Sequence, residues 1–367
     1  MAGALAAAIW PFAGQADETP DVTPLSASGP GPVLRGQIGQ PLRLTLTNGP
    51  DAPASFALRG LRADPDPGFA GLSATPLAPG ERRALVFTPR EAGFALYGAY
   101  EPGGLFGAVV VPEATPPAVD LEAVVVFSGD PAVPQVNGAA LPLTLAAPAG
   151  GRVRLRLASA LCEGMLALST AATVQIVAID GQPCEMFTPR AGDLPLCPSA
   201  RFDLMFDLGE GDGEFALRGA PALRVVASGE RAPARPAIAP LPANPRLPQE
   251  IALERALRAT FRLTGHGVAG PAWPKKPLFQ ARRGQPVVLT LTNDTPEPQT
   301  LRLEGHCARI LHRLDDGWDP YWRDALYIEP GRTLLAAFVA DNPGKWPLAS
   351  ASPENRAKGM ATWFEVR

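Results

Sequence analysis

The chain has 367 residues, which is longer than one hydrophobic core supports, because cores stop growing near ~250–300 residues. Hydrophobic residues make up 46% of it and charged residues 19%, so a disordered, solvated polymer is excluded. The net charge of −3 excludes a globally basic nucleic-acid binder. No charge-free apolar run reaches the ~18 residues of a membrane span. With 37 Gly and 43 Pro, the sequence favours short strands joined by turns over long helices.

The first 19 residues form a segment of their own. They open with a small, apolar run, Met1 to Gly14, which is followed by Gln15-Ala16-Asp17. Such a run is typical of the hydrophobic part of a secretory signal peptide, although no basic residues precede it. A disordered tail is the alternative. We favour export, which would place the protein in the periplasm or outside the cell.

One strand pattern is repeated along the chain. Gly39–Asn48 recurs as Gly284–Asn293, and a weaker copy is Gly151–Leu157. Each copy is a turn glycine followed by alternating apolar and polar residues, which predicts a half-buried strand. In the first copy the leucines are expected to face the core, and Arg43 and Thr45 to face water.

The repeat continues, since Phe56–Gly60 aligns with Leu301–Gly305. Repeats of this kind predict β-sandwiches in tandem, with no long helix beyond a short turn at Pro353 to Gly359. Proline-rich and turn-rich stretches suggest the boundaries. We predict domains at residues 20–115, 116–230 and 249–367, with a stiff proline-rich linker at residues 231–248.

The ordered motifs of the chain resemble a known family. They include Val136-Asn137-Gly138, Asp180-Gly181, the run from Asp316 to Asp324, and the run from Phe338 to Trp346. Together they resemble three-domain multicopper oxidases of the laccase type. The resemblance implies an all-β fold of three tandem cupredoxin-like Greek-key β-sandwich domains. It also implies a mononuclear copper bound by two His and one Cys, and a trinuclear copper cluster bound by eight His that reduces O₂ to water.

Placed on this sequence, the family's motifs imply that the copper ligands are replaced. Their positions fall on Ala57, Arg59, Gly98, Tyr100, Gln299, Arg302, Glu304, Ala349, Ser350, Ala351 and Asn355, and the usual weak axial ligand falls on Met360. The chain's three histidines cannot supply ten. We therefore expect no catalytic residue and no cofactor, with copper only if a non-standard site exists.

We expect an ion-pair network where the trinuclear cluster would have been. Arg59 and Arg302 can pair there with Glu304 or Glu101 if these side chains converge, and cations would repel copper. The alternative is that these side chains face solvent in a collapsed cleft.

The three histidines are assigned other roles. His306 is expected to donate to a backbone carbonyl near a domain interface. Cys307 follows it, and adjacent strand residues point to opposite faces, so the two are not expected to share a metal. His266 and His312 are expected to be exposed.

Cysteines and aromatic residues give weaker signals. One disulfide among Cys162, Cys184 and Cys197 would suit an exported protein, and buried free thiols are the alternative. Three aromatic residues cluster in one loop of the third domain and are expected to pack in its core, although such a cluster can also stack sugars; they are Trp318, Tyr321 and Trp322.

These observations favour a copper-free multicopper-oxidase homologue that acts by binding or as a scaffold. The copper-free bacterial cell-division protein of the same fold is an analogy only. The first alternative is a laccase-like oxidoreductase with a rebuilt metal site; its candidate ligands are Met360, His306, Cys307, Met165, Met186 and Met205. The second is a binding module that holds a small ligand or peptide in the old substrate cleft. We expect an envelope protein as partner, no nucleic acid, and a monomer.

Overall fold

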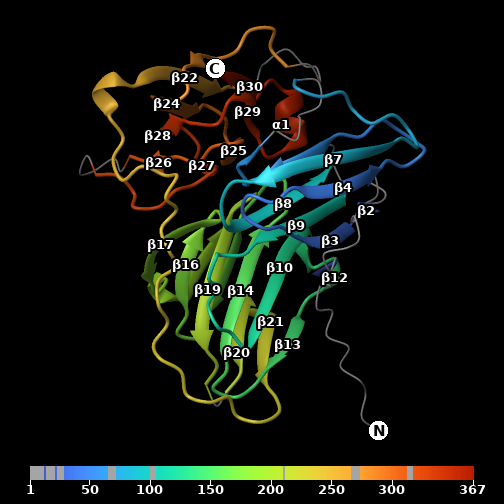
Figure 1. Ribbon diagram of the computed structural model, residues 1–367, viewed down its shortest axis with the longest axis vertical. Coiled ribbons are helices and arrows are strands. Elements are labelled where there is room, and N and C mark those ends of the chain that lie inside the picture. The colour runs from blue at the N-terminus through green and yellow to red at the C-terminus, as the bar shows by residue number, and fades with distance from the viewer. Residues whose placement is uncertain are drawn as a thin grey trace.

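The computed structural model is almost entirely β (Figure 1). It describes residues 12–13, 21–22, 29–64, 72–99, 105–209, 211–265, 273–311 and 317–367. Six sheets pack in pairs as three sandwiches. Within the described ranges, the only α-helix is α1 (Pro353–Ala357), with two short 3₁₀ turns at Arg190–Gly192 and Leu253–Arg255. No helix in these ranges is long and apolar enough to cross a membrane.

The first sandwich pairs a sheet of order β1-β3-β9-β8-β5 with one of order β2-β4-β7-β6. The strands are β1 (Phe12–Ala13), β2 (Asp21–Val22), β3 (Gly29–Arg35), β4 (Leu42–Thr47), β5 (Phe56–Arg59), β6 (Ala63–Asp64), β7 (Arg82–Pro89), β8 (Gly93–Ala99) and β9 (Leu105–Val111). Leu44 and Leu46 of β4 are buried and Arg43 is exposed, so the predicted alternation is confirmed. The short β1 pairs with β3 and lies inside the segment expected to be a signal or tail.

The second sandwich pairs a sheet of order β12-β11-β10-β14-β19-β16-β17 with one of order β13-β21-β20-β15-β18. The strands are β10 (Leu121–Asp130), β11 (Val133–Val136), β12 (Ala139–Ala140), β13 (Leu143–Ala147), β14 (Arg152–Ser159), β15 (Leu166–Thr170), β16 (Gln175–Ile179), β17 (Gln182–Phe187), β18 (Asp193–Leu196), β19 (Arg201–Asp207), β20 (Gly213–Leu217) and β21 (Ala220–Ala227).

The third sandwich pairs a sheet of order β22-β24-β28-β26 with one of order β23-β30-β29-β25-β27. The strands are β22 (Leu257–Leu263), β23 (Gln280–Ala281), β24 (Gln285–Asn293), β25 (Gln299–Leu303), β26 (Arg309–Ile310), β27 (Ala325–Ile328), β28 (Thr333–Ala340), β29 (Gly344–Ser350) and β30 (Ala361–Val366). Helix α1 begins at the predicted position, where the Ser352 hydroxyl caps it by accepting from the Asn355 backbone N–H.

Strand β14 differs from the prediction of a half-buried strand, because all of its residues are buried. Its leucines face the core of the second sandwich, while the opposite face of its sheet packs against the first sandwich. At this interface Val33, Phe94 and Val110 contact Val124 and Val126. The alternation was read correctly, but the polar face meets a neighbouring domain and not water.

The arginines on that second face of β14 are neutralised by buried carboxylates. Arg154 donates to both carboxylate oxygens of Glu113 and to Asp203 at 2.7–2.9 Å. Arg156 donates to Asp203 at 2.6 Å and to Glu122 at 2.8 Å. Glu113 follows β9 of the first sandwich, so its pair with Arg154 links the first two sandwiches, whereas Asp203 and Glu122 belong to the same sheet as β14.

The proline-rich linker has no helix or strand, as predicted, and it is docked onto the domains. Leu241 is buried against Val177 and Met205 of the second sandwich. Asn244 donates to Glu91 of the first sandwich at 2.7 Å and to Gln182 of the second at 2.8 Å. The linker therefore acts as a strap that contacts both sandwiches.

Arg201, the first residue of β19, joins all three sandwiches. Its buried guanidinium donates to Phe94 O of the first sandwich at 2.9 Å and to Asp324 of the third at 2.5 Å. It also donates to the backbone oxygens of Ser199 and Asp180. Gly60 of the first sandwich packs directly on this guanidinium at φ 81°, where a Cβ would overlap it.

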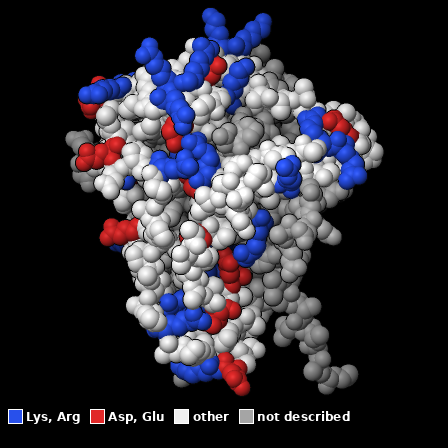
Figure 2. Space-filling view, in the orientation of Figure 1, with Lys and Arg blue, Asp and Glu red and all other residues white. Residues whose placement is uncertain are grey.

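The exposed charges are unevenly spread (Figure 2). Lys and Arg side chains gather over the upper end of the molecule in this view, where Figure 1 places the third sandwich. Both signs mix over the second sandwich below. The exposed arginines of edge strand β22, Arg258 and Arg262, contribute to the charge of the third sandwich.

Arg201→Lys should lower the urea midpoint strongly. A lysine keeps the charge but loses the planar fork, so about three hydrogen bonds of roughly 1 kcal/mol each are lost in a buried site. Equilibrium unfolding followed by tryptophan fluorescence measures this. Arg224→Lys is the matched control, because its pair with Glu214 is exposed. Equal midpoints for the two variants would contradict the role of Arg201.

Candidate functional site

The first candidate site lies where β5 of the first sandwich meets β25 and β29 of the third. Cross-strand pairing sets Arg302 opposite Ala349, and Glu304 follows two residues after Arg302 on the same face. Arg302 Nε lies 3.2 Å from Glu304 Oε1, and both side chains are almost fully buried. From β5, Ala57 contributes to the core of the third sandwich, which brings Arg59 to the same place.

The site is more crowded with cations than the sequence predicted. Arg356 of α1 was not expected there; it donates to the backbone oxygens of Ser350 and Ala351 and acts electrostatically on Arg59 and Glu304. The helix predicted from Pro353 was the only signal for it. We call Arg59, Arg302, Arg356 and Glu304 the arginine cluster.

The charges of the arginine cluster shift one another's protonation. Burial, followed by the guanidiniums of Arg302 and Arg356, lowers the pKa of Arg59 to about 9, so it is still cationic at neutral pH. Burial raises the pKa of Glu304, and Arg302 and Arg59 oppose that shift. The structure thus places Arg59, Arg302 and Glu304 near one another, with Arg302 and Glu304 as an ion pair. Tyr100 and Glu101 lie outside the described residues.

The remaining positions around the arginine cluster carry small groups. Ala57 pairs with Gly98 across β5 and β8, and a Cβ at Gly98 would overlap the backbone oxygen of Leu105. Ala349 and Ala351 are buried. Methyl groups and hydrogen atoms fill these positions, so they supply no donor to a metal.

The second candidate site is a cleft of about 730 Å³ between the second and third sandwiches. Gln299 and Asn355 line it and bond to each other, with Asn355 Nδ2 donating to Gln299 Oε1 at 2.9 Å. Gln299 Nε2 donates in turn to the Thr295 hydroxyl at 3.2 Å. One hydrogen bond therefore joins the two amides, and the buried thioether of Met360 lies in the same wall.

The lining of this cleft is acidic. Four carboxylates face it, against one ammonium group; they are Glu163, Asp294, Glu297 and Glu354, with Lys358. Of these carboxylates, Asp294 forms an ion pair with Arg262 at 2.7 Å. The exposed thioether of Met165 lies on the wall formed by the second sandwich. We call this cavity the acidic cleft.

His306 and Cys307 point to different places, as predicted. His306 is buried among Phe338, Trp346 and Phe364, and its Nδ1 lies 3.4 Å from Glu304 O. Its Nε2 accepts from the Asn342 N–H at 3.4 Å, so the ring is neutral, with its proton on Nδ1. His266 and His312 lie outside the described residues.

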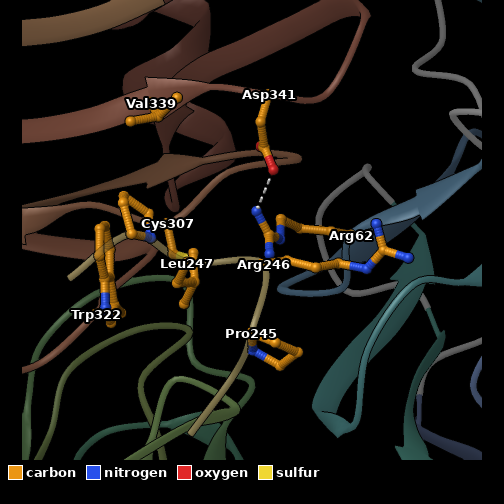
Figure 3. A pocket seen from close by; sticks show the side chains of 9 residues that line it. Arg62, Pro245, Arg246, Leu247, Cys307, Trp322, Val339 and Asp341 are labelled. Atoms are coloured by element: carbon orange, nitrogen blue, oxygen red, sulfur yellow. Dashed lines mark hydrogen bonds and ion pairs between the residues drawn. The ribbon is translucent and has the colours of Figure 1, made fainter. Parts of the chain in front are cut away.

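Cys307 lines a cavity of about 210 Å³ under the linker (Figure 3). Trp322 and Leu247 form its sides, and the pair between Arg62 and Asp341, at 2.9 Å, links the first sandwich to the third beside it. Burial raises the pKa of the Cys307 thiol, so it is a poor nucleophile and ligand at neutral pH.

All four cysteines are free thiols, and the structure forms no disulfide among Cys162, Cys184 and Cys197. The prediction that the loop aromatics pack in the third-domain core is wrong for Tyr321. It packs against the second sandwich, with its ring 5.2 Å from that of Phe187. Trp322 is buried, and Arg309 stacks on it at 4.9 Å.

Comparison with known proteins agrees with this architecture. Residues 242–367 match the family model described as multicopper oxidase. This match covers the end of the linker and the third sandwich. A multi-copper oxidase from Pseudomonas thermotolerans is 26% identical, with a TM-score of 0.80 over 91% of each chain. Lac15 from a marine microbial metagenome is 25% identical, with a TM-score of 0.77 over 92% of this chain and 91% of that one.

A third structure shares the fold alone: the laccase-like CueO of Ochrobactrum sp. is 19% identical, with a TM-score of 0.71 over 95% of this chain and 94% of that one. The structures of this family consist of three cupredoxin domains, so the predicted fold class is confirmed. A search of curated protein sequences finds no significant match.

The side chains at the positions that the resemblance assigns to copper do not fit copper. A blue-copper site needs a thiolate and imidazoles, whereas Gln299 and Asn355 offer only amides that already bond to each other. Guanidinium groups such as those of Arg59 and Arg302 have no lone pair to donate. Among the described residues there is no group of three or more His, Cys, Asp or Glu side chains that could hold a metal ion.

His306 should make the protein acid-sensitive. Burial, and then the guanidinium of Arg62, lowers the pKa of His306 to about 3, against roughly 6.5 in the unfolded chain. As the pH falls below about 6.5, the unfolded chain binds a proton that the folded protein does not, which costs about 1.4 kcal/mol of stability per pH unit. The free energy of unfolding is measured between pH 6.5 and 4.5 for the wild type and for His306→Gln. Its dependence on pH should be weaker in the variant by about 1.4 kcal/mol per pH unit. Parallel curves would contradict the burial of a neutral ring.

Glu304→Gln should destabilise the protein by about 3 kcal/mol, because it removes the carboxylate that neutralises buried guanidiniums. Replacing Arg302 and Glu304 together with leucine should cost less than the sum of the two single leucine variants. Urea titrations of the wild type, the two single leucine variants and the double leucine variant measure this coupling. Glu214→Gln is the control, since that pair is exposed and should change stability by less than about 1 kcal/mol. Additive effects would show that Arg302 and Glu304 act independently.

Proposed function

We propose that this homologue works by binding, without copper redox catalysis. The arginine cluster is the observation that carries the proposal. Arginine side chains from β5, β25 and α1 converge with one glutamate at the junction of the first and third sandwiches. The resemblance assigns the trinuclear cluster to positions including Arg59, Arg302 and Glu304. Fixed positive charges there oppose a copper cation.

The second assigned centre supports the same proposal. Gln299 and Asn355 occupy the histidine positions and bond to each other, and Ser350 occupies the cysteine position. The Ser350 hydroxyl accepts from the Ser352 N–H at 3.2 Å, at the turn that leads into α1. These residues have structural roles in the chain, and none of their side chains is redox-active.

We further propose that the protein is exported and binds another envelope protein, in keeping with its apolar N-terminal run. The Lys and Arg side chains that gather over the third sandwich (Figure 2) suit an acidic partner surface. The acidic cleft suits a small cationic ligand or a basic peptide instead, which is the binding-module alternative.

Copper loading tests the proposal. Purified full-length protein is incubated with Cu(II), and separately with Cu(I) under reducing conditions, then desalted and analysed for metal. We expect much less than one copper per chain, no absorption band of thiolate–copper charge transfer, and no oxidation of a phenolic laccase substrate. Several coppers per chain, or a blue colour, would refute it.

One observation favours the alternative of a rebuilt metal site. Met165 and Met360 both line the acidic cleft, and thioethers bind Cu(I). The other two candidate methionines, Met186 and Met205, pack around Leu241 away from it. If the reducing arm shows one copper per chain, Met165→Leu and Met360→Leu should each abolish it. Retention in both variants would place the ion elsewhere.

A further inference from the structure

A second cavity at the boundary of the second and third sandwiches, of about 410 Å³, is not explained by anything above. It is lined by strands β16, β18 and β19 on one side and by the segment from Tyr321 to Tyr327 on the other. Its volume lies in the range of small-molecule pockets. The positions assigned to copper are outside its lining, and it shares only Tyr327 with the acidic cleft. We call it the aromatic cavity.

Four aromatic side chains belong to this lining. Phe187 and Phe202 come from the second sandwich, and Tyr321 and Tyr327 from the third. The rings of Phe187 and Tyr321 meet across the domain boundary at 5.2 Å with a tilt of 33°. Rings that contact each other at an angle leave faces on which a flat guest can pack.

The cavity also carries groups suited to an anion. Arg323 and Arg190 line it, and the buried Nε of Arg323 has no hydrogen-bond acceptor among the described residues. Asp319 lies 3.3 Å from the Arg323 guanidinium and leaves that Nε unused. Two carboxylates also line the cavity. Asp180 is saturated, because it accepts from three backbone N–H groups, while Asp193 is exposed.

The backbone around the aromatic cavity is strained. Among the described residues, Ala191 lines the cavity at φ 53° and Ser199 lies between two further lining residues at φ 68°. Asp180, at φ 47°, belongs with Gly181 to the two-residue turn between β16 and β17, where positive φ is the ordinary conformation. Ala191, by contrast, gains no side-chain hydrogen bond and costs about 1 kcal/mol or more in this conformation. Strain of this kind concentrates at ligand sites.

We propose that the aromatic cavity binds a flat aromatic molecule that carries one carboxylate. The ring packs against the aromatic side chains that line the cavity from both sandwiches, and the carboxylate accepts from Arg323. This site does not depend on whether copper binds, so its test is separate from the copper-loading experiment.

Isothermal titration of the full-length protein with 2-naphthoate tests the proposal, with 2-naphthamide as the uncharged analogue. We expect saturable binding of one 2-naphthoate per chain and roughly tenfold weaker binding of the amide, the loss typical of one charge-assisted hydrogen bond. Arg323→Gln should weaken 2-naphthoate binding about tenfold and leave the amide unchanged. Arg224→Gln, which lies outside the cavity, should change neither. Equal affinities for the acid and the amide, or no saturation, would overturn the proposal.

A second measurement on the wild-type protein places the ligand. Cys197 lines the aromatic cavity, whereas Cys162 is exposed and outside it. Bound 2-naphthoate should slow the alkylation of Cys197 by N-ethylmaleimide severalfold, as read by peptide mass spectrometry, without changing the rate at Cys162. Unchanged rates at Cys197 under saturating 2-naphthoate would overturn the placement even if binding is seen.

Discussion

Buried arginines hold the three sandwiches together, and the rest of the structure depends on them. Arg201 reaches backbone or carboxylate oxygens in every sandwich, and Arg154 fixes the second sandwich to Glu113 at the end of the first. Removing a charge from water is costly unless its partners are in place. These arginines therefore bind their partners fully only when all three sandwiches are docked, so the charges favour one arrangement of the domains.

The same kind of interaction occurs at the positions that the resemblance assigns to copper. There the arginine cluster is held by charge pairing, and Gln299 and Asn355 are joined by a hydrogen bond. Arg59 of the first sandwich lies within electrostatic reach of Arg302 and Glu304 of the third. The charges of this interior therefore depend on how the first and third sandwiches are docked.

Many of the strands can be predicted from the sequence, because strand alternation and turn glycines are local signals. The repeat gave β4, β14 and β24, and the turn at Pro353 gave α1. The sequence does not show what the polar face of a strand contacts in the folded protein. Arg154 and Arg156 alternate with leucines like any solvent-facing residues, and only the packing of two sheets buries them. The prediction for Tyr321 was wrong for the same reason, since its contact with Phe187 joins residues far apart in the chain. Arg356 entered the arginine cluster through the orientation of a helix, which composition does not encode.

The closed interior contrasts with the open boundary between the second and third sandwiches. The acidic cleft and the aromatic cavity both lie there, and Tyr327 belongs to the lining of both. A ligand at this boundary contacts both sandwiches and would bind the docked arrangement in preference to a separated one, so it would add to the stability that Arg201 provides. The opposite charge preferences of the two cavities also mean that one molecule would not fill both. Binding at this boundary is thus the activity that we propose for the described residues.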